Sequence, residues 1–273
     1  MNGAASGDLR RRLLTAIVVL PPLLAALLFG PTLLLLGIVS LCLLFGLFEF
    51  FDLLRAGRIA PLTALGGIAG AAFFLDSAFP GIAGVPLAPA AVILVFAAAL
   101  LSGDPLRSVP SASFTLLGSA YLGTLGGAMA ALLLVPPASL GGRRILFLLG
   151  IGMGADTAAY FVGRAVGHPR LAPSLSPGKT VEGAAGGLIG GALAALAVRA
   201  LVLPGLPLPD TLLLGILVAA LGALGDLFES LVKRWAGAKD SGRLFPGHGG
   251  MLDRLDSLLF GAPVLYYYFG TLR

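Results

Sequence analysis

Two groups of acidic residues near the C-terminal end have spacings that suit metal-assisted chemistry. The first group occupies positions i, i+3, i+4 and i+7 of a predicted helix and consists of Asp226, Glu229, Ser230 and Lys233. Those intervals place the four side chains on one helical face. The second group, Asp253 and Asp256, lies one turn apart at the start of a following helix. Carboxylates in such sets suit Mg²⁺, which usually keeps several waters and bridges the phosphates of a substrate.

The loop between the two acidic groups is rich in glycine and in basic residues. Lysine and arginine suit phosphate oxygens, and glycine lets backbone N–H groups approach an anion. His248 lies in this loop beside Gly249 and Gly250 and could bind a phosphate or relay a proton. The segment therefore favours metal-assisted phosphoryl or nucleotidyl transfer. The alternative is a solvated loop of mixed charge with no chemical role.

The composition of the whole chain indicates an integral membrane protein. Of its 273 residues, 58% are hydrophobic and only 11% are charged, whereas a soluble domain carries about 25% charged residues. Ten of the 31 charged residues fall within 226–256. Because charge is costly beside a bilayer and is rarely kept there without use, this concentration marks the segment as the candidate site.

Apolar runs punctuated by glycine, proline and charge predict an all-α, multi-pass fold with about nine transmembrane helices. The predicted spans are 13–29, 32–51, 60–79, 86–102, 114–135, 144–163, 184–203, 211–231 and 257–272. We expect a single integral membrane domain, 1–273. Its three parts are the N-terminal helices (1–103), the middle helices with a cytosolic loop (104–183), and the catalytic helices (184–273).

The distribution of basic residues predicts the orientation in the membrane. With the N-terminus in the cytosol, most of the 18 lysines and arginines fall in cytosolic loops, as the positive-inside rule requires. The segment 226–256 then lies at the cytosolic interface. Arg143 and Arg144 are exceptions, because they fall on the opposite side.

The segment from Ser230 to Asp256 resembles the signature of the phosphatidate cytidylyltransferases, or CDP-diacylglycerol synthases. All fixed positions of that signature are met: Ser230, Lys233, Arg234, Lys239, Asp240, His248, Gly249, Gly250, Asp253, Arg254 and Asp256. A second stretch, S-P-G-K-T-V-E-G at 176–183, is similar to the family's S-P-K-K-T-x-E-G, with Gly178 where a lysine is common.

The resemblance implies the transfer of a cytidylyl group from CTP to phosphatidic acid, giving CDP-diacylglycerol and pyrophosphate. It implies Mg²⁺, with K⁺ implicated beside it. By the same resemblance, Asp226 and Asp253 would be the main metal ligands, with Asp256 and Glu229 as further ligands or neighbours. Five basic residues are candidates for the triphosphate and the lipid phosphate: Lys233, Arg234, Lys239, His248 and Arg254.

The expected catalytic residues are Asp226, Asp253, Lys239, His248 and Arg254, and His248 is expected to orient phosphate rather than act as a base. Further substrate contacts are expected from Ser230, Gly249, Gly250, Ser176, Lys179 and Thr180. The expected partners are CTP, phosphatidic acid and membrane lipids, with no nucleic acid. The expected location is the cell (inner) membrane, with the active site facing the cytoplasm.

Three features of the sequence allow more than one interpretation. Residues 176–183 precede a glycine-rich span, so they either bind phosphate at a helix N-terminus or form a capping loop. Asp156 falls within a predicted span, where an acid either is functional or pairs with a neighbour. Small-residue motifs at 66–70, 123–127, 183–191 and 222–225 suit either a homodimer interface or packing within one chain, and the second is favoured for any single motif. A homodimer is expected for the protein as a whole.

Other activities remain possible on sequence grounds. A CTP-dependent lipid kinase acting on a polyprenol or phytol would share the nucleotide chemistry but transfer the γ-phosphate. A CDP-alcohol phosphotransferase is disfavoured, because the D-G-x-x-A-R stretch is absent. An ion-coupled transporter would use intramembrane acids such as Asp156, but the sequence shows no convincing inverted repeat.

Overall fold

Long apolar helices make up most of the chain in the computed structural model, which describes Val18, residues 20–242, Leu244 and residues 249–272. A short helix, Leu20–Phe29, comes first. The labelled helices that follow are α2 (Thr32–Ala56), α3 (Thr63–Ala78), α4 (Leu87–Leu101), α5 (Pro105–Leu134), the 3₁₀ turn η1 (Ala138–Leu140), α6 (Gly141–Val166), α7 (Val181–Val202), α8 (Leu208–Trp235) and α9 (Leu252–Thr271).

Five segments of the described chain are long and apolar enough to cross a membrane: α2, α5, η1 with α6 (Ala138–Val166), α7 and α8. The helix Leu20–Phe29, α3 and α4 are apolar but shorter, and α9 is not among the five. A helical membrane protein is therefore supported. The predicted count of nine spans and the predicted orientation are not confirmed.

A small antiparallel sheet departs from the all-α prediction. Strands β1 (Arg170–Ala172) and β2 (Ser176–Thr180) pair in a segment predicted to be a loop, with Arg170 opposite Thr180. Three prolines, at 169, 173 and 177, exclude a helix there and favour extended backbone. The hairpin ends where Thr180 caps α7, because its Oγ1 accepts a hydrogen bond from the Gly183 N–H at 3.1 Å.

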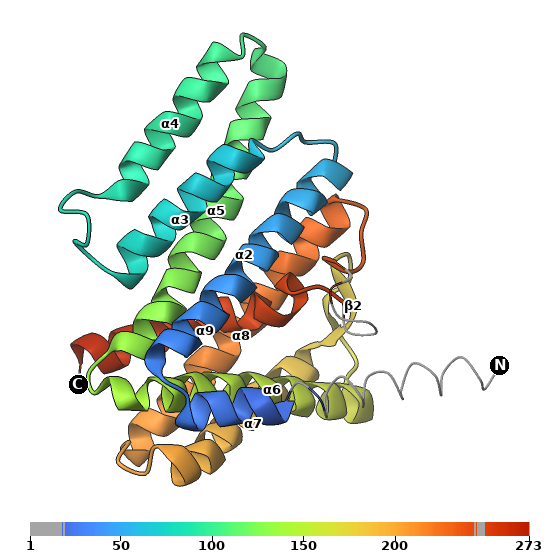
Figure 1. The fold of residues 1–273 in the computed structure, drawn as a ribbon. Helices are drawn as coiled ribbons and strands as arrows, with labels where there is room; N and C mark the ends of the chain where they lie inside the picture. Colours follow the sequence, from blue (N-terminus) through green and yellow to red (C-terminus); the bar gives the residue numbers. More distant parts are fainter. Residues whose placement is uncertain (1–17, 19, 243, 245–248, 273) are drawn as a thin grey trace.

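The helices form two packed groups that meet at α2, α5 and α9. One group contains α3 and α4 packed along α5, and α4 lies at its outer edge (Figure 1). The other contains α6 to α9, in which α6 packs on α7 and α8 packs on α9. The main core contains fully buried side chains such as Phe51, Phe147, Leu252 and Leu259. A second, smaller cluster on α3, α4 and α5 consists of Ala69, Ala91, Val95 and Ala112.

Small residues allow α6 and α7 to approach closely. A Cβ added at Gly190 would lie 2.2 Å from the Cβ of Ala158, and one added at Gly154 would lie 2.3 Å from the Cβ of Ala194. Such distances leave no room for a larger side chain. The motif at 183–191 therefore packs within one chain, and a homodimer stays a prediction.

We expect Gly190→Ala to destabilise the protein by about 1–3 kcal/mol, because the new methyl group overpacks the contact with α6. Thermal unfolding in detergent measures the effect. Gly37→Ala is the matched control, because nothing lies within 4 Å of a Cβ built at that helical glycine. The control should be neutral or slightly stabilising, and equal losses in both variants would contradict the packing argument.

Candidate active site at the ends of α8 and α9

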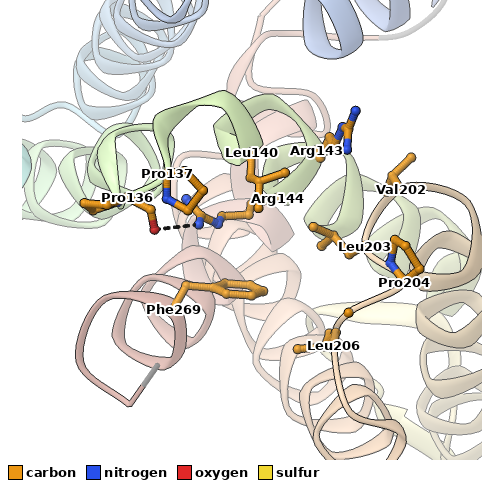
Figure 2. Close-up of a pocket in the computed structure, with 11 residues that line it drawn as sticks. Pro136, Pro137, Leu140, Arg143, Arg144, Val202, Leu203, Pro204, Leu206 and Phe269 are labelled. Carbon is orange, nitrogen blue, oxygen red and sulfur yellow. Dashed lines mark hydrogen bonds between the residues drawn. The ribbon is translucent and has the colours of Figure 1, made fainter.

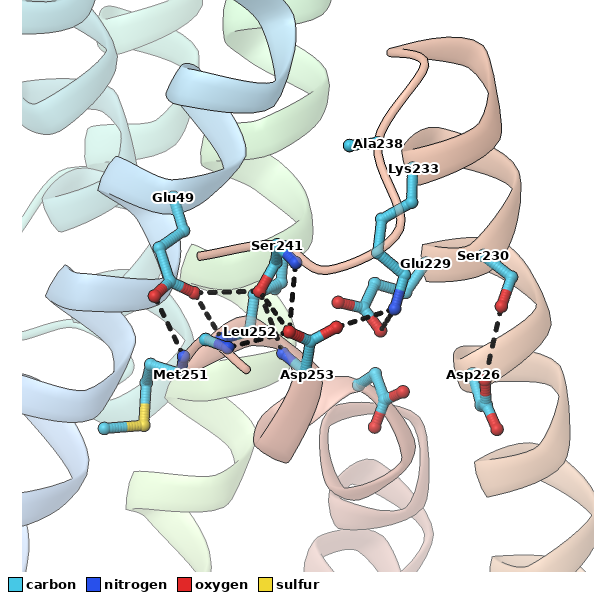
Figure 3. A network of polar contacts seen from close by, with 12 residues as sticks. Glu49, Asp226, Glu229, Ser230, Lys233, Ala238, Ser241, Met251, Leu252 and Asp253 are labelled. Atoms are coloured by element: carbon cyan, nitrogen blue, oxygen red, sulfur yellow. Dashed lines mark hydrogen bonds and ion pairs between the residues drawn. The ribbon is translucent and has the colours of Figure 1, made fainter. Parts of the chain in front are cut away.

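The predicted helical face on α8 exists, because α8 continues unbroken to Trp235. Ser230 Oγ donates a hydrogen bond to Asp226 Oδ1 at 3.4 Å, and Lys233 Nζ lies 3.0 Å from Glu229 Oε2 (Figure 3). These contacts span one helical turn each, as the spacing requires. The helical spacing of these four residues in the sequence therefore predicted their relative positions correctly.

Asp253, in the first turn of α9, is held by four hydrogen bonds. Lys233 Nζ lies 2.6 Å from Asp253 Oδ1. The other oxygen, Oδ2, accepts from the N–H and hydroxyl of Ser241 at 3.0 and 2.9 Å and from the Gly250 N–H at 2.8 Å. Burial alone would raise the pKa of this carboxyl, but the bonds from Lys233, Gly250 and Ser241 outweigh it and lower the pKa to about 2. Asp253 is thus an anion that ties the loop to both helices.

Lys233 lies between Glu229 and Asp253 and joins α8 to α9. Its side chain is 12% exposed, against 1% for Glu229 and 10% for Asp253. Buried charges are tolerated when they are paired and hydrogen-bonded. The ammonium group of Lys233 therefore offsets part of the negative charge that the two carboxylates bring into the protein.

Glu49 on α2 is a member of this network that the sequence analysis did not identify. Its Oε1 accepts from the Met251 N–H at 3.0 Å, and its Oε2 accepts from the Leu252 N–H at 2.8 Å and from the Ser241 hydroxyl at 3.0 Å. Two backbone donors at the start of α9 thus gain an acceptor from α2, and an acid there also complements the helix dipole. The sequence signal for Glu49 was an acid after 36 uncharged positions.

Glycine is required where Glu49 meets the loop. A Cβ at Gly250 would lie 2.3 Å from Glu49 Oε2, and a Cβ at Gly242 would lie 2.3 Å from Glu49 Oε1. Gly249 has a φ of +81°, which favours glycine. The predicted importance of Gly249 and Gly250 thus has a structural reason, and their predicted contact with substrate stays untested.

The hairpin is part of the same site, as the sequence suggested for residues 176–183. Lys179 Nζ lies 2.5 Å from Asp226 Oδ2. Arg234 Nε donates to the Leu175 carbonyl at 3.1 Å, which fixes the hairpin to α8. The hydroxyl of Thr180 caps α7, which supports the capping interpretation of that residue. Its predicted role with phosphate, and that of the half-buried Ser176, stays a prediction.

Asp156 on α6 lies near this cluster rather than alone in the membrane. It interacts electrostatically with Asp226, Lys179 and Arg254. The side chain is exposed on the surface of α6 that adjoins the site. Asp156 therefore lies beside charged neighbours, and its function stays a prediction.

The remaining predicted site residues lie on the loop after α8 or in the first turns of α9. Lys239 and Asp240 are exposed on the loop, and Arg254 is exposed on α9. Asp256, one turn after Asp253, is buried, and burial raises the pKa of its carboxyl, with the charge of Asp226 adding to the rise. His248 lies outside the described residues, so its predicted role is not addressed.

The carboxylates fit a hard cation only in part. Within the described residues, no group of three or more His, Cys, Asp or Glu side chains is arranged to hold a metal ion. Glu229 Oε1, however, is buried without a hydrogen-bond partner there, and Glu229 interacts closely with Asp256. An oxygen without a partner beside a second buried carboxylate suits Mg²⁺. Asp253 is less available to bind a metal ion, because its oxygens already accept four hydrogen bonds.

Several curated proteins of similar sequence are named phosphatidate cytidylyltransferase. The chain is 48% identical over 128 residues to the phosphatidate cytidylyltransferase of Brucella suis, covering 45% of this chain and 46% of that protein. It is 42% identical over 158 residues to the enzyme of the same name from Staphylococcus saprophyticus, covering 58% of this chain and 59% of that protein. It is also 44% identical over 139 residues to the Escherichia coli uncharacterized protein YnbB, covering 50% of this chain and 46% of that protein.

These alignments span about half the length of the curated relatives, so they do not by themselves describe the whole chain. A sequence model of the cytidylyltransferase family covers nearly all of it, from residue 10 to residue 272. That range includes α2, which contributes Glu49, as well as α8 and α9. The chain therefore belongs to the cytidylyltransferase family.

Proposed function

We propose that this protein transfers the cytidylyl group of CTP to phosphatidate and releases pyrophosphate, giving CDP-diacylglycerol. Membership of the cytidylyltransferase family supports nucleotidyl transfer, and the names of the Brucella and Staphylococcus relatives support phosphatidate as the acceptor. The observation that carries the proposal is the network in which Lys233 joins Glu229 to Asp253 between two helix ends.

The proposed reaction is a displacement at phosphorus. A phosphate oxygen of phosphatidate attacks the α-phosphorus of CTP, and the bond from that phosphorus to the bridging oxygen of the β-phosphate breaks. The attacking oxygen is already anionic near neutral pH, so the site needs alignment and charge stabilisation more than a general base. Lys179 and Lys233, each already paired with carboxylates, are placed to exchange those partners for phosphate oxygens.

Asp226, Glu229 and Asp256 would hold Mg²⁺, which neutralises triphosphate charge when bound, and we retain K⁺ as a possible second ion. The role of the protein itself is to hold the loop and helix ends at fixed separation. Asp253 does this through Ser241 and Gly250, so we propose that it positions the site as well as contributing charge.

We propose that the site faces the cytosol at the inner membrane, where CTP is present and phosphatidate lies in the bilayer. The positive-inside distribution of lysine and arginine supports this orientation. The other basic residues, Arg234, Lys239, His248 and Arg254, are then candidates for the triphosphate and the lipid phosphate.

Labelled CTP distinguishes the proposed activity from a lipid kinase. Purified protein with Mg²⁺ and phosphatidate should incorporate ³²P from α-labelled CTP into a lipid and release labelled pyrophosphate from γ-labelled CTP. Incorporation of the γ-label into a polyprenol or phytol would instead establish a kinase. Absence of incorporation from either label, in a lipid mixture that supports a control cytidylyltransferase, would refute the proposal.

Sealed vesicles test the orientation with the same assay. CTP is a highly charged solute that does not cross a bilayer, so inside-out vesicles should incorporate label without detergent. Right-side-out vesicles should require detergent. The reverse pattern would place the carboxylates on the opposite face.

A further inference from the structure

A second polar feature lies at the opposite ends of α6, α7, α8 and α9 from the carboxylates. It is a cavity of about 320 Å³, which we call the arginine pocket (Figure 2). Its walls include Arg143, Arg144, Val202, Leu203, Leu206 and Phe269. Most of these are apolar, so the two arginines are the feature that needs an explanation.

Arg144 is a buried cation without an acidic partner in the described chain. Its side chain lies between Pro136 and the ring of Phe269, with the guanidinium carbon 5.1 Å from the ring centroid (Figure 2). The residue is only 3% exposed. Two of its nitrogens donate to the carbonyls of Val135 and Pro136, at 2.5 and 3.1 Å. These bonds cap the end of α5.

Capping accounts for two nitrogens of Arg144 but not for its charge or its third nitrogen. The Nε atom is buried and has no hydrogen-bond partner among the described residues. A buried N–H that lacks a partner costs about 1–3 kcal/mol, and a buried charge is normally paired. An anion in the arginine pocket would compensate the buried charge of Arg144.

Neighbouring residues add positive charge without compensation. Arg143 is exposed at the rim beside Val202. Arg199 donates to the carbonyls of Leu206 and Pro204, at 2.6 and 3.1 Å. Across the described residues, none of these three arginines forms an ion pair. The acid at this end of α8, Asp210, instead accepts a hydrogen bond from the hydroxyl of Tyr268.

The pocket lies one membrane thickness away from the carboxylates. From Leu208 at the start of α8 to Asp226 there are 18 residues, or about 27 Å at 1.5 Å per residue. The hydrocarbon core of a bilayer is about 30 Å thick. Arginines at that distance, beside apolar walls, lie where the phosphates of the other leaflet are found. This explains why Arg143 and Arg144 depart from the positive-inside distribution.

We infer that the arginine pocket binds the phosphate of an anionic membrane phospholipid at the face opposite the carboxylates. The guanidinium of Arg143 would contact phosphate oxygens, and the buried charge of Arg144 would add electrostatic attraction. Val202, Leu203 and Phe269 would contact the glycerol and the first carbons of the acyl chains. The volume admits a headgroup but not a whole lipid. A membrane lipid is favoured over free phosphate because most of the lining is apolar.

Thermal unfolding of the full chain in detergent tests the inference, with short-chain phosphatidylglycerol as the probe. Phosphatidylglycerol should raise the Tm in a saturable manner, and zwitterionic phosphatidylcholine should not. Arg143→Gln should raise the half-saturating concentration about tenfold, the loss expected for one charge-assisted contact. Arg143 is exposed, so this variant should fold, whereas replacement of Arg144 also removes the α5 cap.

Arg107→Gln is the matched control. Arg107 is an exposed arginine at the start of α5, where its side chain is 90% exposed beside Asp104. It should leave phosphatidylglycerol binding unchanged. Three results would overturn the inference: equal weakening by both variants, which indicates general electrostatic attraction; no weakening by Arg143→Gln; or the same Tm increase with inorganic phosphate alone, which indicates a free-anion site.

Discussion

Replacement of Asp253 by asparagine is expected to lower the rate of CTP incorporation into lipid by about 10²–10³-fold, the range for losing one preorganised electrostatic contact. Asparagine keeps the shape of the side chain and can still accept bonds from Ser241 and Gly250. It cannot compensate the charge of Lys233, which lies 2.6 Å from Asp253 Oδ1. The lysine would then pair with Glu229 alone and draw it away from any cation. The measurement is the initial rate with α-labelled CTP, phosphatidate and Mg²⁺.

Asp104→Asn controls for the chemistry of the substitution. Asp104 caps α5 by accepting from the Leu106 N–H and lies beside Arg107 at an exposed site. Asparagine caps helices as well as aspartate does, so this variant should keep full activity. The Asp253 variant should remain folded with a loss of about 1–3 kcal/mol in stability. Full activity in a folded Asp253→Asn variant would show that this carboxylate charge has no part in the reaction.

Glu49→Gln is expected to reduce kcat about 10²-fold with little change in the KM for CTP. Glutamine presents one acceptor oxygen where Glu49 accepts from Met251, Leu252 and Ser241, and its amide N–H₂ would face backbone donors. The start of α9 should shift, and Asp253 with it. Misplacement by about 1 Å costs roughly 10²-fold in rate. Glu49 makes none of the proposed substrate contacts, so the loss should fall on kcat.

Asp76→Asn separates this positioning role from simple loss of stability. Asp76 on α3 accepts from the N–H groups of Leu87 and Ala88, at 3.0 and 2.7 Å, at the start of α4. It is thus the same kind of contact, an acid from one helix that caps another, far from the carboxylate network. Both variants should lower the Tm, and only Glu49→Gln should lower kcat. A parallel fall of kcat in both would reduce the role of Glu49 to general stability.

The parts of the site that could be predicted are those set by local geometry. Asp226, Glu229, Ser230 and Lys233 lie on one face because helical periodicity fixes side chains three and four residues apart. The start of α9 before Asp253 followed from the end of the glycine-rich loop. The density of charge in an apolar chain indicated the segment, and its resemblance to a known signature indicated the family.

The parts that could not be predicted depend on contacts between distant segments. Glu49 stands out only as the first charge after 36 uncharged positions, and Ser241 does not stand out at all. Their partners appear only when α2 packs beside α9. The pairing of Lys179 with Asp226 likewise depends on a hairpin that the apolar pattern does not reveal. The count of nine spans stays a prediction for a related reason: buried side chains of α3 and α4 pack together with α5, so an apolar sequence there does not by itself require a membrane span.

The contact between Glu49 and α9 also has a consequence for biosynthesis. Glu49 and Met251 are 202 positions apart, so α2 leaves the ribosome long before its partner is made. At 5–20 residues per second the delay is roughly 10–40 s. Throughout that interval the carboxylate of Glu49 lacks the Met251, Leu252 and Ser241 donors that it has in the folded chain. The network that joins α2 to the start of α9 therefore forms only after α9 has been synthesised.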